Sequence, residues 1–428
     1  MRSVAVIGKN FGDEGKGLVS ASLCCSSEHP LIIRHNGGAQ AGHTVENVSR
    51  GTRMVHHQTG SGSEYGAHTL FAKSFHPDLF VIDRELEEFQ HIYRFLPKLY
   101  SEAEASITTI DDVLLNMLSE TKRGNNRHGS CGMGIYECCL RSGEALAEES
   151  TEYAGPQGTP DFKITVGEVV GKDAVQLFEK LRYIREHYTK PRALAIIGRN
   201  DSDKGEVLTE PDESLRTYRE LLWDDTVLEN YARAVTENAK RIEITDANSL
   251  FLRQYDQLIF ETGQGLLLDE NNTRFLPHVT GSKTGMWEAV RFLRNRGMIL
   301  EEAIYVTRPY VTRHGAGCLP CECDISELPG VRTDATNVKN EWQGSIRYGK
   351  HESLREFLQP IYEDFISAAQ NAQTKKSLAV THLDETKDRL YFQEGPVTTE
   401  SFLKLCKEEF FRIYGAYDRE RLVVLKDE

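Results

Sequence analysis

Short apolar runs recur along the chain, and longer amphipathic segments separate them. The apolar runs cover residues 4–7, 31–33, 194–197, 258–260, 303–306, 378–380 and 422–425. Runs of this kind are typical of buried parallel strands. Helical spacing of apolar residues marks segments 83–95, 175–187, 214–240, 284–296 and 352–371. The alternation predicts an α/β fold, with a doubly wound, mostly parallel central sheet, helices on both faces and long functional loops at the strand ends.

The domain organisation follows from length and continuity. The chain has 428 residues, which is enough for a large core. No internal repeat and no long low-complexity stretch divides it. We therefore expect residues 1–428 to form a single large catalytic domain with inserted helical subregions. In open α/β sheets, ligands bind at the carboxyl ends of the strands, so the site is expected there.

A glycine-rich turn follows the first apolar run directly. Residues 8–17 read Gly-Lys-Asn-Phe-Gly-Asp-Glu-Gly-Lys-Gly, and a helical segment follows them. Strand, glycine turn and helix in this order can bind phosphate through backbone N–H groups and the helix dipole. The turn is not a standard P-loop, because Gly17 stands where that motif has Ser or Thr. A tight structural turn is the alternative.

A second glycine-rich turn, residues 34–44, follows the apolar run 31–33 and contains His43. Because Asp13 and His43 follow consecutive strands, the two side chains can face one bound phosphate. A carboxylate can remove a proton from a purine ring amide or bind Mg²⁺. A histidine can donate a proton to a phosphate that gains charge. The alternatives are that Asp13 opposes a helix dipole and that His43 is structural.

The two turns together resemble the adenylosuccinate synthetase family, whose members join aspartate to IMP at the expense of GTP. The resemblance rests on Gly12-Asp13-Glu14-Gly15-Lys16-Gly17 and on Asn36-Gly37-Gly38-x-x-Ala41-Gly42-His43-Thr44. It implies that Asp13 is the general base at N1 of the purine, and that His43 is the general acid at the β–γ bridge of the triphosphate.

The resemblance also implies binding roles within the same two turns. Asp13 and the carbonyl of Gly42 would hold Mg²⁺. Lys16 would contact the nucleotide phosphates. The residues that would complete the nucleotide and phosphate site are Gly12, Gly15, Gly17 and Thr44.

Later motifs resemble the family less evenly. Residues 129–135 resemble its phosphate loop Thr-Thr-Gly-Arg-Gly-Ile-Gly, which makes Ser130 and Cys131 substrate-binding residues by resemblance. Arg141 is the nearest candidate for an arginine that reaches the partner subunit's nucleotide. Residues 261–265 resemble Glu-Gly-Ala-Gln-Gly, where the glutamine, here Gln264, contacts the purine nucleotide. Each of these stretches could also be a structural polar turn.

Two further matches follow. Residues 279–284 resemble Val-Thr-Ser-Ser-Asn-Thr, so Thr280 would contact the substrate phosphate, or else begin the helix near residue 284. Residues 312–317, Thr-Arg-His-Gly-Ala-Gly, resemble Thr-Arg-Val-Gly-Ala-Gly of the family. Arg313 could therefore clamp an anion through two hydrogen bonds, or be an exposed loop arginine.

The amino-acid loop is the weakest match. The family has a dense run, Thr-Gly-Arg-Arg-Arg-Arg-Thr-Gly-Trp, whereas residues 343–350 keep only Arg347 as an arginine. Two carboxylates of aspartate call for several paired cations. Either Lys350 and other residues compensate, or the amine is not free aspartate.

Residues 378–384 resemble Leu-x-x-Thr-Lys-Leu-Asp, where the aspartate binds guanine and selects GTP. By resemblance, Asp384 would bind the base of the triphosphate, and His382 would replace the lysine that packs on it. A helix cap is the alternative for Asp384.

Charge and cysteine content restrict the partners and the setting. The formal net charge of −14 argues against nucleic acid or a membrane surface as partner. Nine cysteines without a secretory signal, and no apolar run of about 18 residues, favour a reducing, cytoplasmic setting. The resemblance implies a homodimer.

The sequence thus predicts a ligase that joins an amine, L-aspartate first, to C6 of a 6-oxopurine nucleotide, IMP first, with GTP and Mg²⁺. One alternative keeps this chemistry with a GMP- or dGMP-like purine, with ATP, or with another amine. A second alternative is a non-catalytic nucleotide-binding regulator on the same fold.

Overall fold

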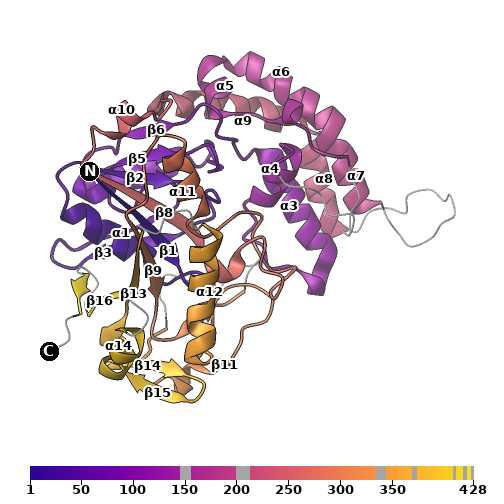
Figure 1. Ribbon diagram of the computed structural model, residues 1–428. Coiled ribbons are helices and arrows are strands. Elements are labelled where there is room, and N and C mark those ends of the chain that lie inside the picture. The colour runs from indigo at the N-terminus through magenta and orange to yellow at the C-terminus, as the bar shows by residue number, and fades with distance from the viewer. Residues whose placement is uncertain are drawn as a thin grey trace.

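The computed structural model describes residues 1–144, 156–198, 213–333, 344–368, 374–407, 411–417 and 422–425. Its centre is a ten-stranded sheet in the order β17-β16-β13-β9-β1-β8-β2-β5-β6-β7 (Figure 1). The strands are β1 (Arg2–Gly8), β2 (Pro30–Arg34), β5 (His68–Phe71), β6 (Leu99–Ser101), β7 (Ile242–Ile244), β8 (Gln257–Gly265), β9 (Glu302–Thr307), β13 (Lys375–Val380), β16 (Arg412–Gly415) and β17 (Val423–Val424). Neighbouring strands are parallel except β16 and β17. The predicted fold class is confirmed.

Helices cover both faces of this sheet because its strands are apolar on both sides. Val4 and Val6 of β1 pack with residues of α1 (Lys16–Cys25) in one core. Ala5 and Ile7 point to the other face and join the core that contains α11 (Trp287–Arg294) and α12 (Leu354–Ser367).

A group of helices is inserted between β6 and β7, which are neighbours in the sheet (Figure 1). Its members are α3 (Ile110–Arg123), α4 (Ile135–Arg141), α5 (Val166–Gly171), α6 (Ala174–Ile184), α7 (Lys190–Ile197), α8 (Glu213–Trp223) and α9 (Asp225–Asn238). These helices build most of a separate hydrophobic core. Helix α2 (Ile82–Tyr93) connects β5 to β6.

Two sequence expectations fail in this region. Residues 194–197 are the end of helix α7 and not a strand, because Ala193 and Ile196 are buried whereas Leu194 is 42% exposed, as on a one-sided helix. The expected helix 214–240 is divided into α8 and α9. Asp224 interrupts it, because its carboxylate accepts the backbone N–H of Thr226 and caps α9.

The remaining elements form small units beside the sheet. They are β3 (His43–Asn47) with β4 (Thr52–His56), β10 (Val311–Arg313) with β12 (Arg347–Gly349) and β11 (Glu322–Cys323), and β14 (Arg389–Phe392) with β15 (Gly395–Thr398), together with the helices α10 (Ser249–Leu252), α13 (Leu383–Thr386) and α14 (Thr399–Lys407). None of the described helices combines the length and the apolar character that a membrane crossing requires.

Candidate functional site

A cavity of about 1610 Å³ lies at the carboxyl ends of the central strands. Its walls come from the loops after β1, β2, β8, β9 and β13, and from segments beside α3 and α4. Single small-molecule sites are typically about 300–1,000 Å³, so this cavity has room for more than one ligand. The sequence-predicted residues that line it are Gly12, Asp13, Gly15, Lys16, Gly17, Gly42, His43, Thr44, Ser130, Cys131, Gln264, Thr280, Arg313 and His382.

The loop after β1 folds around its own carboxylate. Oε1 of Glu14 accepts the backbone N–H groups of Asn10 and Gly12, each at 2.9 Å. Oε2 of Glu14 lies 2.8 Å from Nζ of Lys16, and both side chains are buried. A Cβ at Gly8 would lie 2.5 Å from the Glu14 carboxylate, so the close approach requires glycine there. A phosphate bound at Lys16 would therefore either share the Lys16 ammonium with the Glu14 carboxylate or displace that carboxylate.

The Asp13 side chain lies among basic side chains. Its backbone has a φ of 60°, and its Oδ2 lies 2.9 Å from Nε2 of His314. Burial by itself would raise the pKa of Asp13. The hydrogen bond and charge of His314, with the charges of Arg308 and Lys16, outweigh burial and lower this pKa. Asp13 is consequently a carboxylate at neutral pH.

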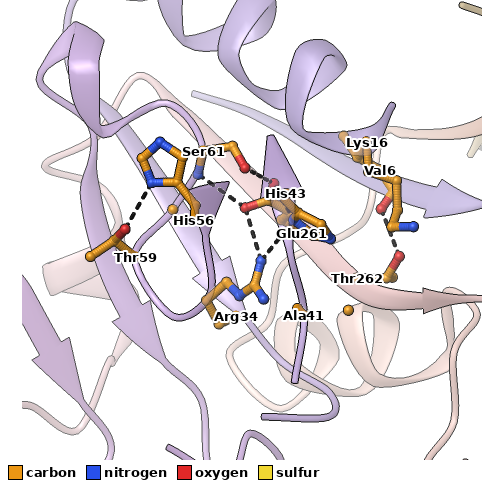
Figure 2. Close-up of polar contacts among 12 residues, drawn as sticks. Val6, Lys16, Arg34, Ala41, His43, His56, Thr59, Ser61, Glu261 and Thr262 are labelled. Carbon is orange, nitrogen blue, oxygen red and sulfur yellow. Dashed lines mark hydrogen bonds and ion pairs between the residues drawn. The ribbon is translucent and has the colours of Figure 1, made fainter. Parts of the chain in front are cut away.

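His43 belongs to a buried ion-pair network (Figure 2). Its Nδ1 lies 2.9 Å from Oε1 of Glu261 on β8, and Nη1 of Arg34 lies 3.2 Å from Oε2 of the same glutamate. The hydroxyl of Ser61 also donates to Glu261. Within the described part of the chain, Nε2 of His43 has no hydrogen-bond partner. The network therefore fixes the ring through Nδ1 and leaves Nε2 available to a ligand.

The charges in this network follow from burial and pairing. Burial by itself would raise the pKa of Glu261, but His43, Arg34 and Ser61 lower it well below its usual range. Burial lowers the pKa of His43, and Glu261 only partly opposes this effect. We assign neutral His43 with its proton on Nδ1, donating to Glu261. A polyanionic ligand beside Nε2 would raise the pKa of His43 and favour the doubly protonated ring.

The other wall residues are more loosely arranged. The hydroxyl of Ser130 donates to Oδ1 of Asn116 at 2.8 Å, and burial raises the pKa of the Cys131 thiol. Oε1 of Gln264 is buried, and none of the described residues gives it a hydrogen bond. The hydroxyl of Thr280 lies 3.5 Å from that of Ser282, and helix α11 begins only at residue 287, so Thr280 is not its cap.

Arg313 contacts its own chain. Nη1 donates to the carbonyl of Cys318 at 2.6 Å, and Nη2 donates to that of His278 at 2.8 Å. Burial and the nearby charge of Arg347 lower its pKa to about 10. An anion bound beside Arg313 would therefore stabilise the charge of its partly desolvated guanidinium.

Three predicted site residues are not brought to the cavity. Arg141 is buried in a bidentate pair with Asp112, with both distances 2.8 Å, so its guanidinium is used inside the chain and not toward a partner subunit. Arg347 pairs with Glu322 and donates to the carbonyls of Gly315 and Gly317. Asp384 is exposed on α13, beside His382, which does line the cavity. Residue 343 of the predicted amino-acid loop lies outside the described residues.

Sequence reasoning missed the partners of the two reactive groups. Arg34 and Glu261 face each other in the register of β2 and β8, and each follows an apolar run directly. A charged residue at the end of a buried strand is a signal that could have identified this pair, because unpaired buried charges are costly. No comparable signal connects His314 with Asp13, because the two residues lie on distant segments.

The oxygen donors of the cavity fit the ion that the sequence implied. The Asp13 carboxylate and the exposed Gly42 line the same cavity, and Mg²⁺ prefers carboxylate and carbonyl oxygens. A different cluster, His76, Cys139 and Glu144, is also compact. Its Cys139 contacts Nε2 of His76 at 3.4 Å and its Glu144 contacts Nδ1 at 3.7 Å. Cys139 and Glu144 thus contact opposite nitrogens of the His76 ring. The three side chains therefore form a chain of polar contacts with His76 in the middle.

Fold and site together define an α/β protein with a cavity at the carboxyl ends of its central strands, where a carboxylate follows β1 and a histidine follows β2, the two strands on either side of β8. A family model described as adenylosuccinate synthetase matches residues 5–143 and 202–350, which is more than half of the chain. The chain belongs to the adenylosuccinate synthetase family, and the resemblance read from its motifs is confirmed.

The relatives are distant. Adenylosuccinate synthetase of Cyanothece sp. (strain PCC 7425 / ATCC 29141) is 28% identical over 323 residues, which are 75% of this chain and 63% of that protein. The match thus spans less than two thirds of that relative. Adenylosuccinate synthetase of Thermosipho africanus (strain TCF52B) is 26% identical over 338 residues, 78% of this chain and 69% of that protein.

Two solved structures share the fold. Fully ligated adenylosuccinate synthetase from Plasmodium falciparum has a TM-score of 0.67 at 17% identity, covering 99% of each chain. The succinoaminodeoxyadenylate synthetase (PurZ) of cyanophage S-2L, bound to dGMP and dATP as an energy donor, has a TM-score of 0.58 at 13% identity. That match covers 99% of this chain and 95% of the other.

Proposed function

We propose that this protein is a purine-nucleotide ligase that forms a C6–N bond on a 6-oxopurine nucleotide at the expense of a nucleoside triphosphate. The observation that carries the proposal is the presence of Asp13, Lys16 and His43 in one cavity of about 1610 Å³. A base, a phosphate-binding cation and an acid are the groups that such a reaction needs.

The reaction has two steps. Asp13 removes the N1 proton of the purine, and the 6-oxo oxygen attacks the γ-phosphorus. The bond from the γ-phosphorus to the β–γ bridging oxygen breaks, and His43, once its Nε2 carries a proton, stabilises the charge that develops there. The amine nitrogen then attacks C6 and loses one proton to solvent, and phosphate leaves with the former 6-oxo oxygen.

Asp13 and Gly42 would hold Mg²⁺, whose contribution when bound is to neutralise charge on the phosphates. Lys16 would pair with the same phosphates after it releases Glu14. Gln264 supports a purine contact because its buried Oε1 takes no hydrogen bond from the described residues.

The substrates of first choice are IMP, GTP and L-aspartate. The alternative purine is a guanine nucleotide, ribo or deoxy, and the alternative energy donor is ATP. The sparse arginine of residues 344–350 and the exposed Asp384 motivate keeping these alternatives, as does the solved relative bound to dGMP and dATP. A homodimer in the cytoplasm, without nucleic acid or membrane partners, remains our expectation.

Phosphate release measured for every pairing of IMP, GMP and dGMP with GTP and ATP, with and without aspartate, tests the proposal. We expect release that depends on both nucleotides and on the amine. Asp13→Ala should lower turnover about 10²–10⁴-fold while the protein still binds the triphosphate. Absence of release in all pairings, with intact nucleotide binding, would favour a non-catalytic regulator instead.

A further inference from the structure

Helix α3, one of the inserted helices (Figure 1), turns a polar face toward the cavity. Four polar residues spaced i, i+3, i+4 and i+7 lie on this face and line the cavity, namely Asn116, Ser119, Glu120 and Arg123. The leucines on the other side of the helix, Leu114, Leu115 and Leu118, pack into the core of the inserted helices. A polar helix face that lines a cavity indicates a polar ligand in that part of the cavity.

The polar face of α3 holds the glycine-rich loop 129–135, which resembles a phosphate loop. Oδ1 of Asn116 accepts the hydroxyl of Ser130 at 2.8 Å, and the oxygen of that hydroxyl accepts the backbone N–H of Gly132 at 3.2 Å. Oε2 of Glu120 accepts the backbone N–H of Gly129 at 3.0 Å. Helix α3 therefore fixes the position of the loop at the cavity.

The carboxylate of Glu120 also holds Arg123. Its Oε1 lies 2.5 Å from Nη1 of Arg123, while its Oε2 binds the loop at Gly129. The Glu120 side chain is buried, and Arg123 lines the cavity. A guanidinium has five N–H donors, so one carboxylate oxygen does not exhaust it. The two oxygens of one buried carboxylate thus place a cation beside the loop.

The loop itself lacks a cation. Met133 stands where the resembling loop has arginine. A phosphate that leaves water for a site without a counter-charge pays a large desolvation penalty. Two other arginines of the inserted helices, Arg141 and Arg192, are each bound to a carboxylate through two nitrogens. Arg123 differs from both, because the carboxylate that holds it also holds the loop.

We propose that Arg123 binds the 5′-phosphate of the purine nucleotide and supplies from α3 the positive charge that the loop lacks. The hydroxyl of Ser130 can rotate its proton from Asn116 to a phosphate oxygen and act as the neutral donor beside Arg123. A guanidinium matches the geometry of a phosphate and forms charge-assisted hydrogen bonds with it. This inference rests on the ligase function proposed above, and it defines the substrate as a nucleoside monophosphate and not a nucleoside.

A phosphate ligand and a structural residue have different effects on binding. Loss of a phosphate ligand weakens the binding of the monophosphate alone, whereas a disturbed loop weakens the monophosphate and its nucleoside alike. Calorimetry therefore compares IMP with inosine, and dGMP with deoxyguanosine. Arg123→Met should weaken monophosphate binding about 10- to 100-fold and leave nucleoside and triphosphate binding as in wild type. Arg123→Lys should lie between the two, because lysine keeps the charge without the planar fork.

Two further variants separate charge from structure. Lys122→Met is the matched control, because Lys122 is the neighbouring cation of α3, does not line the cavity and lies 3.5 Å from the carbonyl of Ile197. It should keep wild-type affinities. The double variant Glu120→Gln with Arg123→Met removes the carboxylate that Arg123→Met leaves unpaired, and it should show the same selective loss. Urea unfolding shows whether each variant is folded.

Unchanged monophosphate binding in Arg123→Met would overturn the inference. Equal weakening of monophosphate and nucleoside, in Arg123→Met and in the double variant, would also overturn it, because Arg123 would then act by supporting the loop. Failure of the proposed function looks different. In that case no pairing of nucleotides releases phosphate, while the calorimetric difference between IMP and inosine still depends on Arg123.

Discussion

Replacing Glu261 with glutamine should damage both the stability of the fold and the action of His43. Glu261 is fully buried and lies 3.2 Å from Arg34, whose side chain is also fully buried, and 2.9 Å from His43. Glutamine keeps the size of the side chain but removes its charge, so the guanidinium stays in the interior without a counter-charge. Breaking one side of a buried ion pair costs about 3–5 kcal/mol.

Urea unfolding at pH 7 measures this loss. Glu302→Gln is the matched control, because Glu302 is a buried glutamate of the same sheet whose charged partner, Arg2, is 40% exposed. Ser377 and Tyr414 also donate to its Oε1, and glutamine keeps an oxygen that can accept from them. The guanidinium of Arg2 can recover water when its partner is lost. The control should therefore lose only about 1 kcal/mol in the free energy of unfolding.

The same variant has a kinetic signature. In the variant, a neutral amide oxygen replaces the carboxylate as acceptor for Nδ1 of His43, and Nη1 of Arg34, 3.1 Å from Nδ1, competes by donating to it, so the ring form with its proton on Nδ1 is less favoured. Loss of a hydrogen bond to a charged group should lower kcat about 10- to 100-fold, with little change in nucleotide binding measured by calorimetry. If Glu261→Gln loses no more stability than Glu302→Gln and keeps its kcat, the buried pair does not have the role assigned to it.

Four further substitutions give separate tests. His43→Asn should lower kcat more than it weakens triphosphate binding, because the proton matters mainly as the β–γ bond breaks; equal losses would make His43 a ground-state ligand. Burial raises the pKa of Asp364 to about 7, against about 3.9 in an unfolded chain. The folded state therefore keeps a proton that the unfolded state loses, and the free energy of unfolding falls as the pH rises from about 4 to 7. Asp364→Asn should flatten that dependence in unfolding measured at several pH values. Arg347→Ala should raise the KM for the amine no more than that for the purine nucleotide, because Arg347 supports the turn at residues 315–317; a selective rise for the amine would show that it contacts the amine's carboxylate. Asp384→Asn should relax a preference for GTP if Asp384 reaches the base, and a wild type that prefers ATP would refute that assignment.

Sequence patterns predict the elements that depend on residues close together in the chain. They do not predict contacts between segments that are far apart in the sequence. The run at residues 4–7 and its glycine turn could be placed because a buried strand and a phosphate loop have local patterns. Residues 194–197 are as apolar as a strand, yet they lie on one face of a helix, and periodicity over so few positions cannot separate the two. The place of Arg141 after a motif predicts a ligand contact, whereas in the structure Asp112, 29 residues earlier, binds it.

The two reactive side chains share one design principle, since each is oriented by a partner from another segment. Glu261 of β8 holds His43, and His314 after β10 holds Asp13. In the first pair, Glu261 lies on the central sheet and pairs there with Arg34 of β2, whereas His43 begins β3 of the small sheet beside it. The second pair is connected through the carbonyls of Gly315 and Gly317 to Arg347 in the stretch that departs most from the family's arginine run. Sequence changes in that stretch can therefore alter the position of Asp13 through His314. The contacts of His43 with Glu261 would stay unchanged.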